Sequence, residues 1–324
     1  MTPPHSTLDT SPPQTSAPVS IGEERPERAR SVPPKGFLPA DLPLNERSLL
    51  TVHGPALNRM LGRSIAAGPE PDEAFRPPRR ANRADFRAIC EAQFLPGSGL
   101  TGIDHLRELA ERARAGEPGM VLASHGSNFD VPNLDTLAAR VGGQDVFDQL
   151  VFLAGRKLGE ESPVTQMLSE VYPRLVVTPP AWFEQPGLTK EQLARGRRMN
   201  LTALRESRRV LRDGRLLFLF PTGTRERPGR PETRVALSQT ANYLRMVKNV
   251  CLLGFRGNTL PPHESGVMVR EEVQQAALQI RISPVTTVDE LTRATFGEVR
   301  TPRKDEERQQ LADEVMRRIE ALRR

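Results

Sequence analysis

Short apolar runs alternate with amphipathic stretches from residue 116 onward. The run at 121–123 is followed by 131–141, whose apolar spacing predicts a helix. Further strands are predicted at 150–154, 175–178, 215–220, 250–255 and 278–283. Helices are predicted between and after them, at 163–171, 189–212, 232–248 and 303–323. Such alternation is typical of a mostly parallel or mixed sheet flanked by helices, so we predict an α/β domain over 116–324.

The preceding region, residues 37–115, has helical spacing without the strand pattern. Its apolar positions predict amphipathic helices at 44–61, 83–94 and 102–115, with an interruption near Pro55 and Pro-rich linkers between them. We predict a small N-terminal helical subdomain here.

Residues 1–36 are rich in Pro, Ser and Thr and hold few large apolar side chains, which predicts a disordered tail. A transit peptide is the alternative interpretation. The acidic residues of this stretch argue against it, because transit peptides avoid acids.

Composition narrows the class of protein. Of the 324 residues, 37% are hydrophobic and 27% charged, and no apolar run approaches the roughly 18–20 residues that span a bilayer. The formal net charge of +6 favours an anionic partner: nucleic acid, anionic lipid, an acidic protein or a phosphorylated substrate. Only 5% of the residues are aromatic, and basic strands carry no aromatic platforms, so a nucleic-acid-binding protein is the remote alternative.

The two cysteines, Cys90 and Cys251, are far apart in sequence and each lies among apolar residues. Without a secretory signal, two buried thiols are expected rather than a disulfide. This pattern indicates a cytoplasmic protein, and any membrane contact is expected to be peripheral, at the inner membrane surface. The sequence contains no metal-ligand cluster and no dinucleotide fingerprint.

The first candidate for chemistry is the turn that follows the strand at 121–123. His125 lies on this turn and Asp130 lies five residues later, at the start of the predicted helix, with turn-forming residues between them. An imidazole oriented by a carboxylate can act as a general base. The alternative is that Asp130 only caps the helix before Pro132 and that His125 is incidental. On this segment alone the two interpretations are equally good.

Two further strand ends carry cations. After the strand at 215–220, Gly223 allows a close backbone approach, and Arg225 and Arg227 follow on the same turn. Arg156 and Lys157 follow the strand at 150–154. Guanidinium groups bind phosphate, and the carboxyl ends of parallel strands meet at one edge of a sheet. One base beside several cations indicates an enzyme for a phosphorylated alcohol, whereas two arginines alone would indicate only a solvated turn.

Together these segments resemble the glycerolipid acyltransferases. That family shares a His-x-x-x-x-Asp motif, here His125 and Asp130, a Gly- and Arg-containing block, here 155–157, and a Phe-Pro-x-Gly-Thr-Arg motif, here 220–225. A fourth block is similar to the apolar strand at 250–255 with the prolines at 261–262, so the resemblance spans about 119–262 in the family's order.

A small hydroxyl residue at Thr222, followed by Gly and an Arg-x-Arg pair, resembles the soluble, chloroplast-type glycerol-3-phosphate acyltransferases. One departure concerns the phosphate site: that subgroup has a Lys-His pair before the long helix, whereas residues 177–182 here contain no cation.

The resemblance implies acyl transfer from a thioester to glycerol 3-phosphate in phospholipid synthesis. The alternative acceptor is 1-acylglycerol 3-phosphate or another lysolipid. The resemblance also implies His125 as general base, Asp130 as its orienting carboxylate, and no acyl-enzyme. Gly223 and Thr222 would form the turn that stabilises the oxyanion. The phosphate-binding cations would be Arg225, Arg227, Arg156 and Lys157. No cofactor or metal is expected beyond the co-substrate, acyl-acyl carrier protein or acyl-coenzyme A.

The predicted helix at 189–212 is strongly basic. Its arginines are Arg195, Arg197, Arg198, Arg205, Arg208, Arg209 and Arg212. Such a run is most often a solvated face. The alternative is a docking surface for acyl carrier protein, which is acidic, or for an anionic bilayer.

Overall fold

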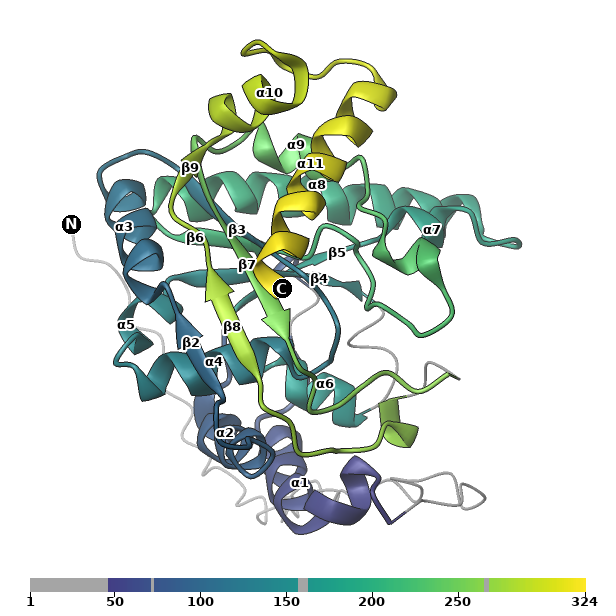
Figure 1. Ribbon diagram of the computed structural model, residues 1–324. Helices are drawn as coiled ribbons and strands as arrows, with labels where there is room; N and C mark the ends of the chain where they lie inside the picture. The colour runs from purple at the N-terminus through teal and green to yellow at the C-terminus, as the bar shows by residue number, and fades with distance from the viewer. Residues whose placement is uncertain (1–45, 71–72, 157–162, 265–267) are drawn as a thin grey trace, which may run out of the picture. The chain divides into compact units, whose positions relative to one another are not determined.

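The computed structural model describes residues 46–70, 73–156, 163–264 and 268–324. Its strands are β1 Phe75–Arg76, β2 Gly99–Thr101, β3 Gly119–Ala123, β4 Leu150–Gly155, β5 Arg174–Val177, β6 Leu216–Leu219, β7 Asn249–Arg256, β8 Gln279–Ile282 and β9 Thr286–Thr287. Its helices are α1 Leu49–Ala66, α2 Arg83–Glu91, α3 Ile103–Arg114, α4 Asp130–Arg140, α5 Gln144–Phe147, α6 Pro163–Ser169, α7 Pro180–Phe183, α8 Lys190–Arg212, α9 Thr240–Leu244, α10 Val288–Phe296 and α11 Asp305–Arg323 (Figure 1).

The described strands form one nine-stranded sheet in the order β1-β5-β4-β6-β3-β7-β8-β2, with β9 paired to β7. Its centre, from β5 to β7, is parallel. At the edges, β1 is antiparallel to β5, both β8 and β9 are antiparallel to β7, and β2 is parallel to β8. The predicted α/β fold with a mixed sheet is therefore confirmed. The parallel centre also places the carboxyl ends of β3, β4, β5 and β6 at one edge.

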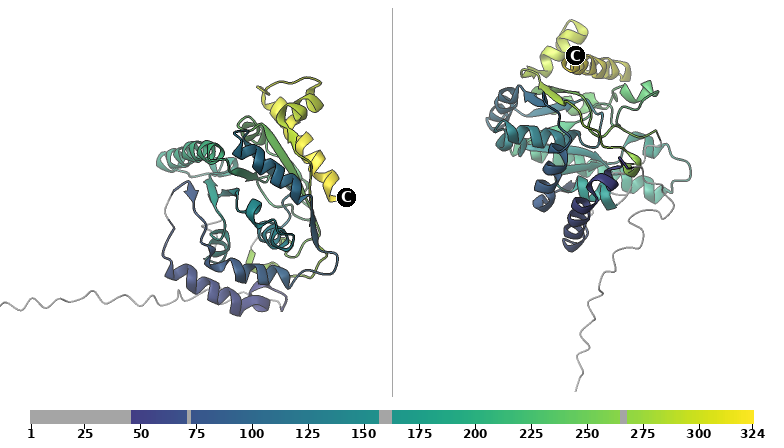
Figure 2. Two further views of the ribbon diagram at one scale, coloured as in Figure 1. Left: turned by 90° about the vertical axis from the view of Figure 1, so that its left-hand side faces the viewer. Right: turned by 60° about the horizontal axis from the view of Figure 1, so that its bottom comes forward.

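Burial on both faces explains the continuous apolar runs of the central strands. In β6, Leu217 belongs to an apolar cluster with Val210 of α8 and Ile319 of α11. The next residue, Phe218, points to the opposite face, where its ring lies 4.9 Å from that of Phe152. Helices consequently cover both sides of the sheet (Figure 2).

The N-terminal predictions have different outcomes. Helices α1, α2 and α3 lie within the region 37–115, as expected, and α1 departs from helical geometry at His53, two residues before Pro55. The same region also supplies β1 and β2, which pair with β5 and β8. The described residues all belong to one compact unit, and a domain boundary at 115–116 stays a prediction. The predicted tail, 1–36, lies outside the described residues.

The long helix predicted at 232–248 is wrong. The structure has a 3₁₀ turn at Pro231–Arg234 and the short helix α9, separated by residues 235–239. Here the backbone bonds to other elements: the Leu237 amide donates to the Pro221 carbonyl, at 2.8 Å, and Gln309 of α11 donates to the Ala236 carbonyl. Tertiary contacts therefore override the helical spacing. Within the described residues, no helix combines the length and the apolar character that crossing a membrane requires.

Candidate active site

The turn between β3 and α4 holds His125 and Asp130 together. One carboxylate oxygen of Asp130, Oδ2, accepts hydrogen bonds from His125 Nδ1 at 2.9 Å, from the Gly126 amide at 2.8 Å and from the Ser127 amide at 3.0 Å. Asp130 thus shapes the turn and orients the imidazole at the same time. The alternative, a helix cap with an incidental histidine, is not what the structure shows: Asp130 is the first residue of α4, and its carboxylate accepts from His125 and from amides that precede the helix.

The second nitrogen of His125 is left for chemistry. Because a carboxylate only accepts, Nδ1 carries the proton in the neutral ring and Nε2 holds a lone pair. The ring stacks on Phe220, with centroids 3.8 Å apart, and 18% of the His125 side chain is exposed. Nε2 makes no hydrogen bond to any described residue. The geometry is that of an oriented base with one accessible acceptor.

The same turn is fixed to the chain beyond β7. The Ser127 hydroxyl donates to the Leu260 carbonyl at 2.8 Å, and the Asn258 amide group donates to the Gly126 carbonyl at 2.8 Å. The region of the fourth block at 250–262 therefore supports the His125 turn by hydrogen bonds between side chains and backbone carbonyls.

The turn after β6 lies against the His125 turn. Gly223 adopts φ +63°, and a Cβ at this position would lie 2.6 Å from Leu237 Cδ1. The Gly223 amide donates to the Phe220 carbonyl, and the buried Thr222 hydroxyl donates to the Thr224 carbonyl. The amide of Glu226 then donates to the His125 carbonyl at 2.8 Å, which joins the two turns directly.

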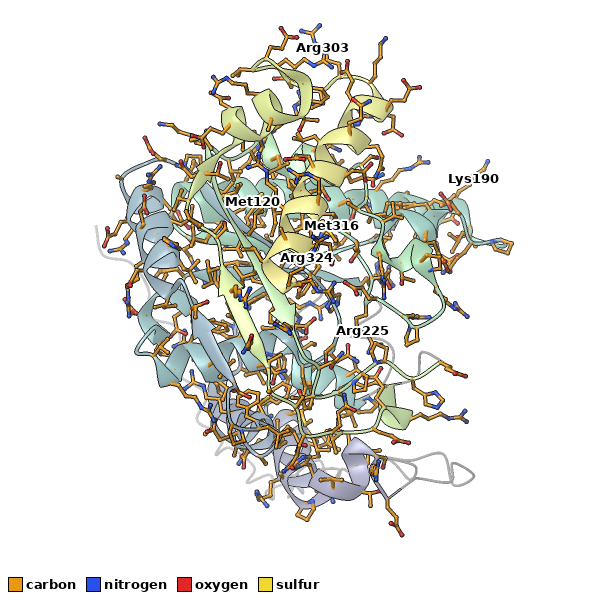
Figure 3. All side chains as sticks on the ribbon, viewed as in Figure 1. Met120, Lys190, Arg225, Arg303, Met316 and Arg324 are labelled. Atoms are coloured by element: carbon orange, nitrogen blue, oxygen red, sulfur yellow. The ribbon has the colours of Figure 1, made fainter. Side chains whose placement is uncertain are left out.

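Arg225 has a partner that the sequence does not reveal. This arginine is nearly buried and forms an ion pair with Glu271, which is fully buried. Asn128, on the His125 turn, donates to the other carboxylate oxygen of Glu271 at 3.3 Å. Figure 3 shows Arg225 near the end of the β7 arrow, at the carboxyl edge of the sheet. Glu271 comes 46 residues after Arg225 and follows a single 3₁₀ turn, so no local pattern marks it.

The other predicted cations lie in different settings. Arg227 lines the same cavity as His125, and its buried Nε has no partner among the described residues. The Arg156 guanidinium lies 5.8 Å from the centroid of the Trp182 ring, on α7, and Arg156 is not among the residues that line the cavity. Lys157 lies outside the described residues. The structure thus brings His125, Asp130, Arg225 and Arg227 together.

A cavity of about 870 Å³ lies beside this cluster, at the carboxyl edge of the sheet. At one part of its wall stand His125, Arg225 and Arg227. Elsewhere the wall is mainly apolar and aromatic, with side chains from several elements, namely Phe86, Phe152, Leu168, Tyr172, Phe183, Leu204, Leu219 and Met246. A space of this kind fits a ligand with an anionic head and an apolar body.

Thr178, which follows β5, also lines the cavity and was not among the predicted site residues. Its backbone amide and carbonyl both bond to the Asn200 side chain of α8, at 2.7 and 2.9 Å. Asn200 lines the cavity as well, so α8 helps to form this wall.

Comparison with models of known protein families gives a match. A family model described as Acyltransferase matches residues 103–287, which is more than half of the chain and runs from the first residue of α3 to the last residue of β9. The match includes every residue of the cluster around His125. No curated protein matches this chain.

Proposed function

Because this chain belongs to the glycerolipid acyltransferase family, and is thus an acyltransferase, we propose that it moves a fatty acyl group from a thioester to the free hydroxyl of glycerol 3-phosphate. The observation that carries this proposal is the combination of an oriented imidazole and two arginines in one cavity. The donor would be acyl-acyl carrier protein or acyl-coenzyme A.

His125 acts as the general base. Its Nε2 takes the proton of the acceptor hydroxyl while the oxygen attacks the thioester carbonyl carbon, and Asp130 stabilises the imidazolium that forms. The C–S bond then breaks, and the departing sulfur takes the proton from the imidazolium. The acyl group passes straight to the acceptor, with no acyl-enzyme.

Backbone and arginine groups hold the charges. The Gly223 amide already donates to Phe220, so we assign oxyanion stabilisation to the neighbouring Thr224 amide, which donates to no backbone acceptor among the described residues. Arg225 and Arg227 bind the phosphate of the acceptor. The Glu271 carboxylate neutralises part of this positive charge and fixes the direction of Arg225.

A lysolipid such as 1-acylglycerol 3-phosphate is the second candidate acceptor. It is favoured by the absence of a cation in 177–182, where Thr178 lines the wall, and by a cavity of about 870 Å³, which is much larger than glycerol 3-phosphate requires. Both acceptors use the same base and the same chemistry.

The test is acyl transfer by purified protein, with labelled palmitoyl-acyl carrier protein or palmitoyl-coenzyme A and each acceptor in turn. His125→Ala should reduce kcat by about 10²- to 10⁴-fold, because a general base contributes that much. His105→Ala, which removes an imidazole from α3, is the control and should keep wild-type kcat. Near-normal turnover in His125→Ala would reject the mechanism, and transfer only to the lysolipid would replace the acceptor.

A further inference from the structure

One face of α8 carries an exposed basic stripe. Arg197, Leu201, Arg205, Arg208 and Arg212 are all exposed, and their spacing of four, four, three and four residues places them on one side of a helix. We call these five residues the α8 stripe. At 1.5 Å per residue it is roughly 22 Å long.

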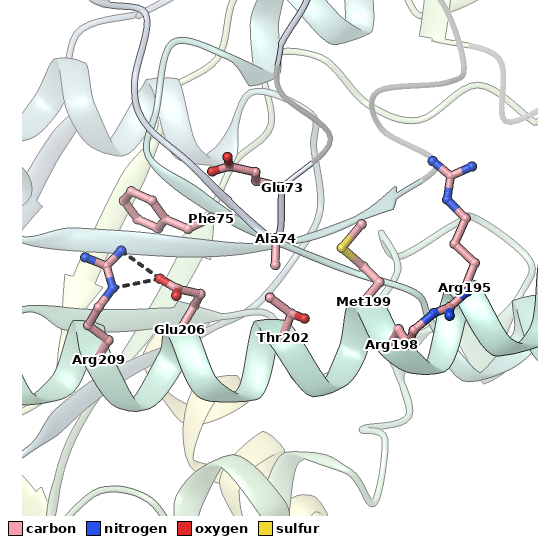
Figure 4. Close-up of a pocket in the computed structure, with 9 residues that line it drawn as sticks. All are labelled: Glu73, Ala74, Phe75, Arg195, Arg198, Met199, Thr202, Glu206 and Arg209. Atoms are coloured by element: carbon pink, nitrogen blue, oxygen red, sulfur yellow. Dashed lines mark hydrogen bonds and ion pairs between the residues drawn. The ribbon is translucent and has the colours of Figure 1, made fainter.

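The arginines of the α8 stripe have no acidic partner in the part of the chain that the structure describes. Among the described residues, none of the four forms an ion pair. The flank of α8 toward β1 is different: there Arg209 bonds to Glu206 and lies 5.3 Å from the centroid of Phe75, beside a hollow of about 490 Å³ (Figure 4). The positive charge of the α8 stripe is therefore available to an external anion.

The stripe is not suited to insertion into a membrane. The apolar side of α8, which includes Ala203, Val210 and Leu211, is buried in the protein. An interfacial helix needs such a side for the lipid. On the exposed side, Leu201 is 57% exposed and stands between arginines. A basic face on which apolar side chains are few and stand among arginines fits an acidic protein surface better than a bilayer.

The α8 stripe lies next to the cavity. Leu204 lies one turn from Arg208 and from Leu201, and it lines the cavity together with Asn200. At the N-terminal end of α8, helix α7 packs against Gly196, where an added Cβ would lie 2.9 Å from the Trp182 ring (Figure 1). Phe183 of α7 also lines the cavity. A partner seated on the stripe would thus stand beside the cavity wall.

We propose that the α8 stripe docks an acidic carrier protein that delivers the acyl thioester to His125. This proposal rests on the proposed acyl transfer. The α8 stripe, roughly 22 Å long, is long enough to contact a helix or a similar surface of a partner protein. It is longer than the phosphate groups of a free nucleotide donor such as acyl-coenzyme A would need. Charge complementarity brings the carrier to the stripe, Leu201 contacts its apolar centre, and the thioester arm enters the cavity past Leu204.

The test compares Arg205→Glu/Arg208→Glu with a control of equal charge change, Arg293→Glu/Arg303→Glu, on exposed residues of α10 and the segment before α11. Initial rates are measured with palmitoyl-acyl carrier protein and with palmitoyl-coenzyme A. We expect the stripe variant to raise KM for the carrier donor roughly 10- to 100-fold, with kcat/KM for palmitoyl-coenzyme A unchanged. The control should match wild type with both donors.

Binding of the carrier without its acyl group, followed by fluorescence anisotropy, gives a readout that does not need turnover. We expect wild-type binding that weakens with salt and is lost in the stripe variant. If the stripe variant and the control variant had the same KM for the carrier donor, the docking proposal would be wrong. The proposed acyl transfer would not be affected by that result. A third outcome is that wild type does not bind the carrier but sediments with phosphatidylglycerol vesicles, and that the stripe variant does not. In that case the α8 stripe would bind a membrane and not a carrier protein. If wild type used neither donor, the proposed acyl transfer would be rejected. The anisotropy measurement would then still show whether the α8 stripe binds the carrier.

Discussion

At the scale of single residues, the pair of Arg225 and Glu271 connects phosphate binding to the architecture of the turns. Glu271 is fully buried and receives Arg225 from the turn after β6 and Asn128 from the turn after β3. An arginine has five donors, so one ion pair leaves others for a phosphate in the cavity. Removing Arg225 alone takes this counter-ion from a fully buried carboxylate, which is costly.

This arrangement separates two effects of losing Arg225. Arg225→Gln should weaken acceptor binding by about 1.5–3 kcal/mol, seen as a raised acceptor KM, and should also lower stability because the buried Glu271 carboxylate loses its ion pair with Arg225. The double variant Arg225→Gln/Glu271→Gln should recover stability in thermal unfolding but keep the high KM. A double variant with wild-type KM would contradict the phosphate role of Arg225.

Gly223 gives a prediction with a close internal control. Both Gly223 and Gly229 have positive φ, +63° and +72°, so alanine at either should cost about 1–2 kcal/mol of stability. Only at Gly223 does the added Cβ meet another group, Leu237 Cδ1 at 2.6 Å. We expect Gly223→Ala to lower kcat/KM by roughly 10-fold and Gly229→Ala to leave it near wild type. Equal kcat/KM in the two variants would show that the Gly223 contact does not shape the site.

Sequence reasoning identifies those site residues that act within a local pattern. His125 and Asp130 are separated by one turn and follow an apolar strand, and their hydrogen bond needs no distant contact. Glu271 is different, because its meaning depends on Arg225 and Asn128, which come from two other strand ends. Arg156 was assigned to phosphate from its place after a strand, but a strand end does not fix the direction of a long side chain, and it lies over Trp182.

At the scale of elements, a buried carboxylate fixes α4, the helix that begins with Asp130. Asp135 is fully buried and accepts from Arg83 and Arg87 of α2, at 2.6–3.0 Å, and from the Tyr172 hydroxyl at 3.2 Å. Burial by itself would raise the pKa of Asp135, but the hydrogen bonds from Arg83 and Arg87 bring that pKa below its ordinary value. The ion cluster therefore stabilises the folded state.

We expect Asp135→Asn to lower the free energy of unfolding by about 3–5 kcal/mol, because it leaves two arginines without their shared partner. Asp104→Asn is the control: Asp104 is 85% exposed in its pair with Arg107, so its loss should cost about 0–1 kcal/mol. Chemical denaturation at neutral pH measures both.

The sign of the pH dependence follows from the lowered pKa. The contribution of Asp135 is fully present above about pH 4, the ordinary range of an aspartate, and is lost as the pH falls through the lower pKa of the folded state. The difference between wild type and Asp135→Asn should therefore shrink only in this acidic range. A difference that is constant down to pH 2 would exclude the charge of Asp135 as its cause.

Elements are predictable from sequence where local signals agree. The helix predicted at 189–212 is observed at 190–212, with Thr189 and Gln192 forming a capping box and Gly214 at φ +70° after its end. The wrong prediction of a helix at 232–248 was based on helical spacing alone. There the Leu237 backbone bonds to the turn after β6, a contact that depends on the folded site.

At the scale of the whole described unit, the parallel strands bring the site residues to one edge of the sheet. A helix that lies outside the family match also contacts the site. Helix α11 follows residue 287, where the match ends. It packs on β7 at Gly254, where an added Cβ would lie 2.7 Å from Leu322 Cβ. Its last residue, Arg323, bonds to both carboxylate oxygens of Glu226, at 2.5 and 3.2 Å. The Glu226 amide in turn bonds to the His125 carbonyl.

This chain of contacts makes Arg323 a positioning residue for the two turns. We expect Arg323→Ala to lower kcat by roughly 10-fold while the acceptor KM changes little, because the phosphate arginines keep their own contacts. Arg317→Ala, on an exposed part of α11, should keep wild-type kcat, since its pair with Glu314 touches no site residue. Arg323→Lys should recover part of the loss, because an ammonium can still reach one carboxylate oxygen but cannot bind both in the same fork. If Arg323→Ala lowered stability but left kcat unchanged, α11 would only pack on β7. The contacts from Arg323 through Glu226 to His125 would then have no effect on catalysis.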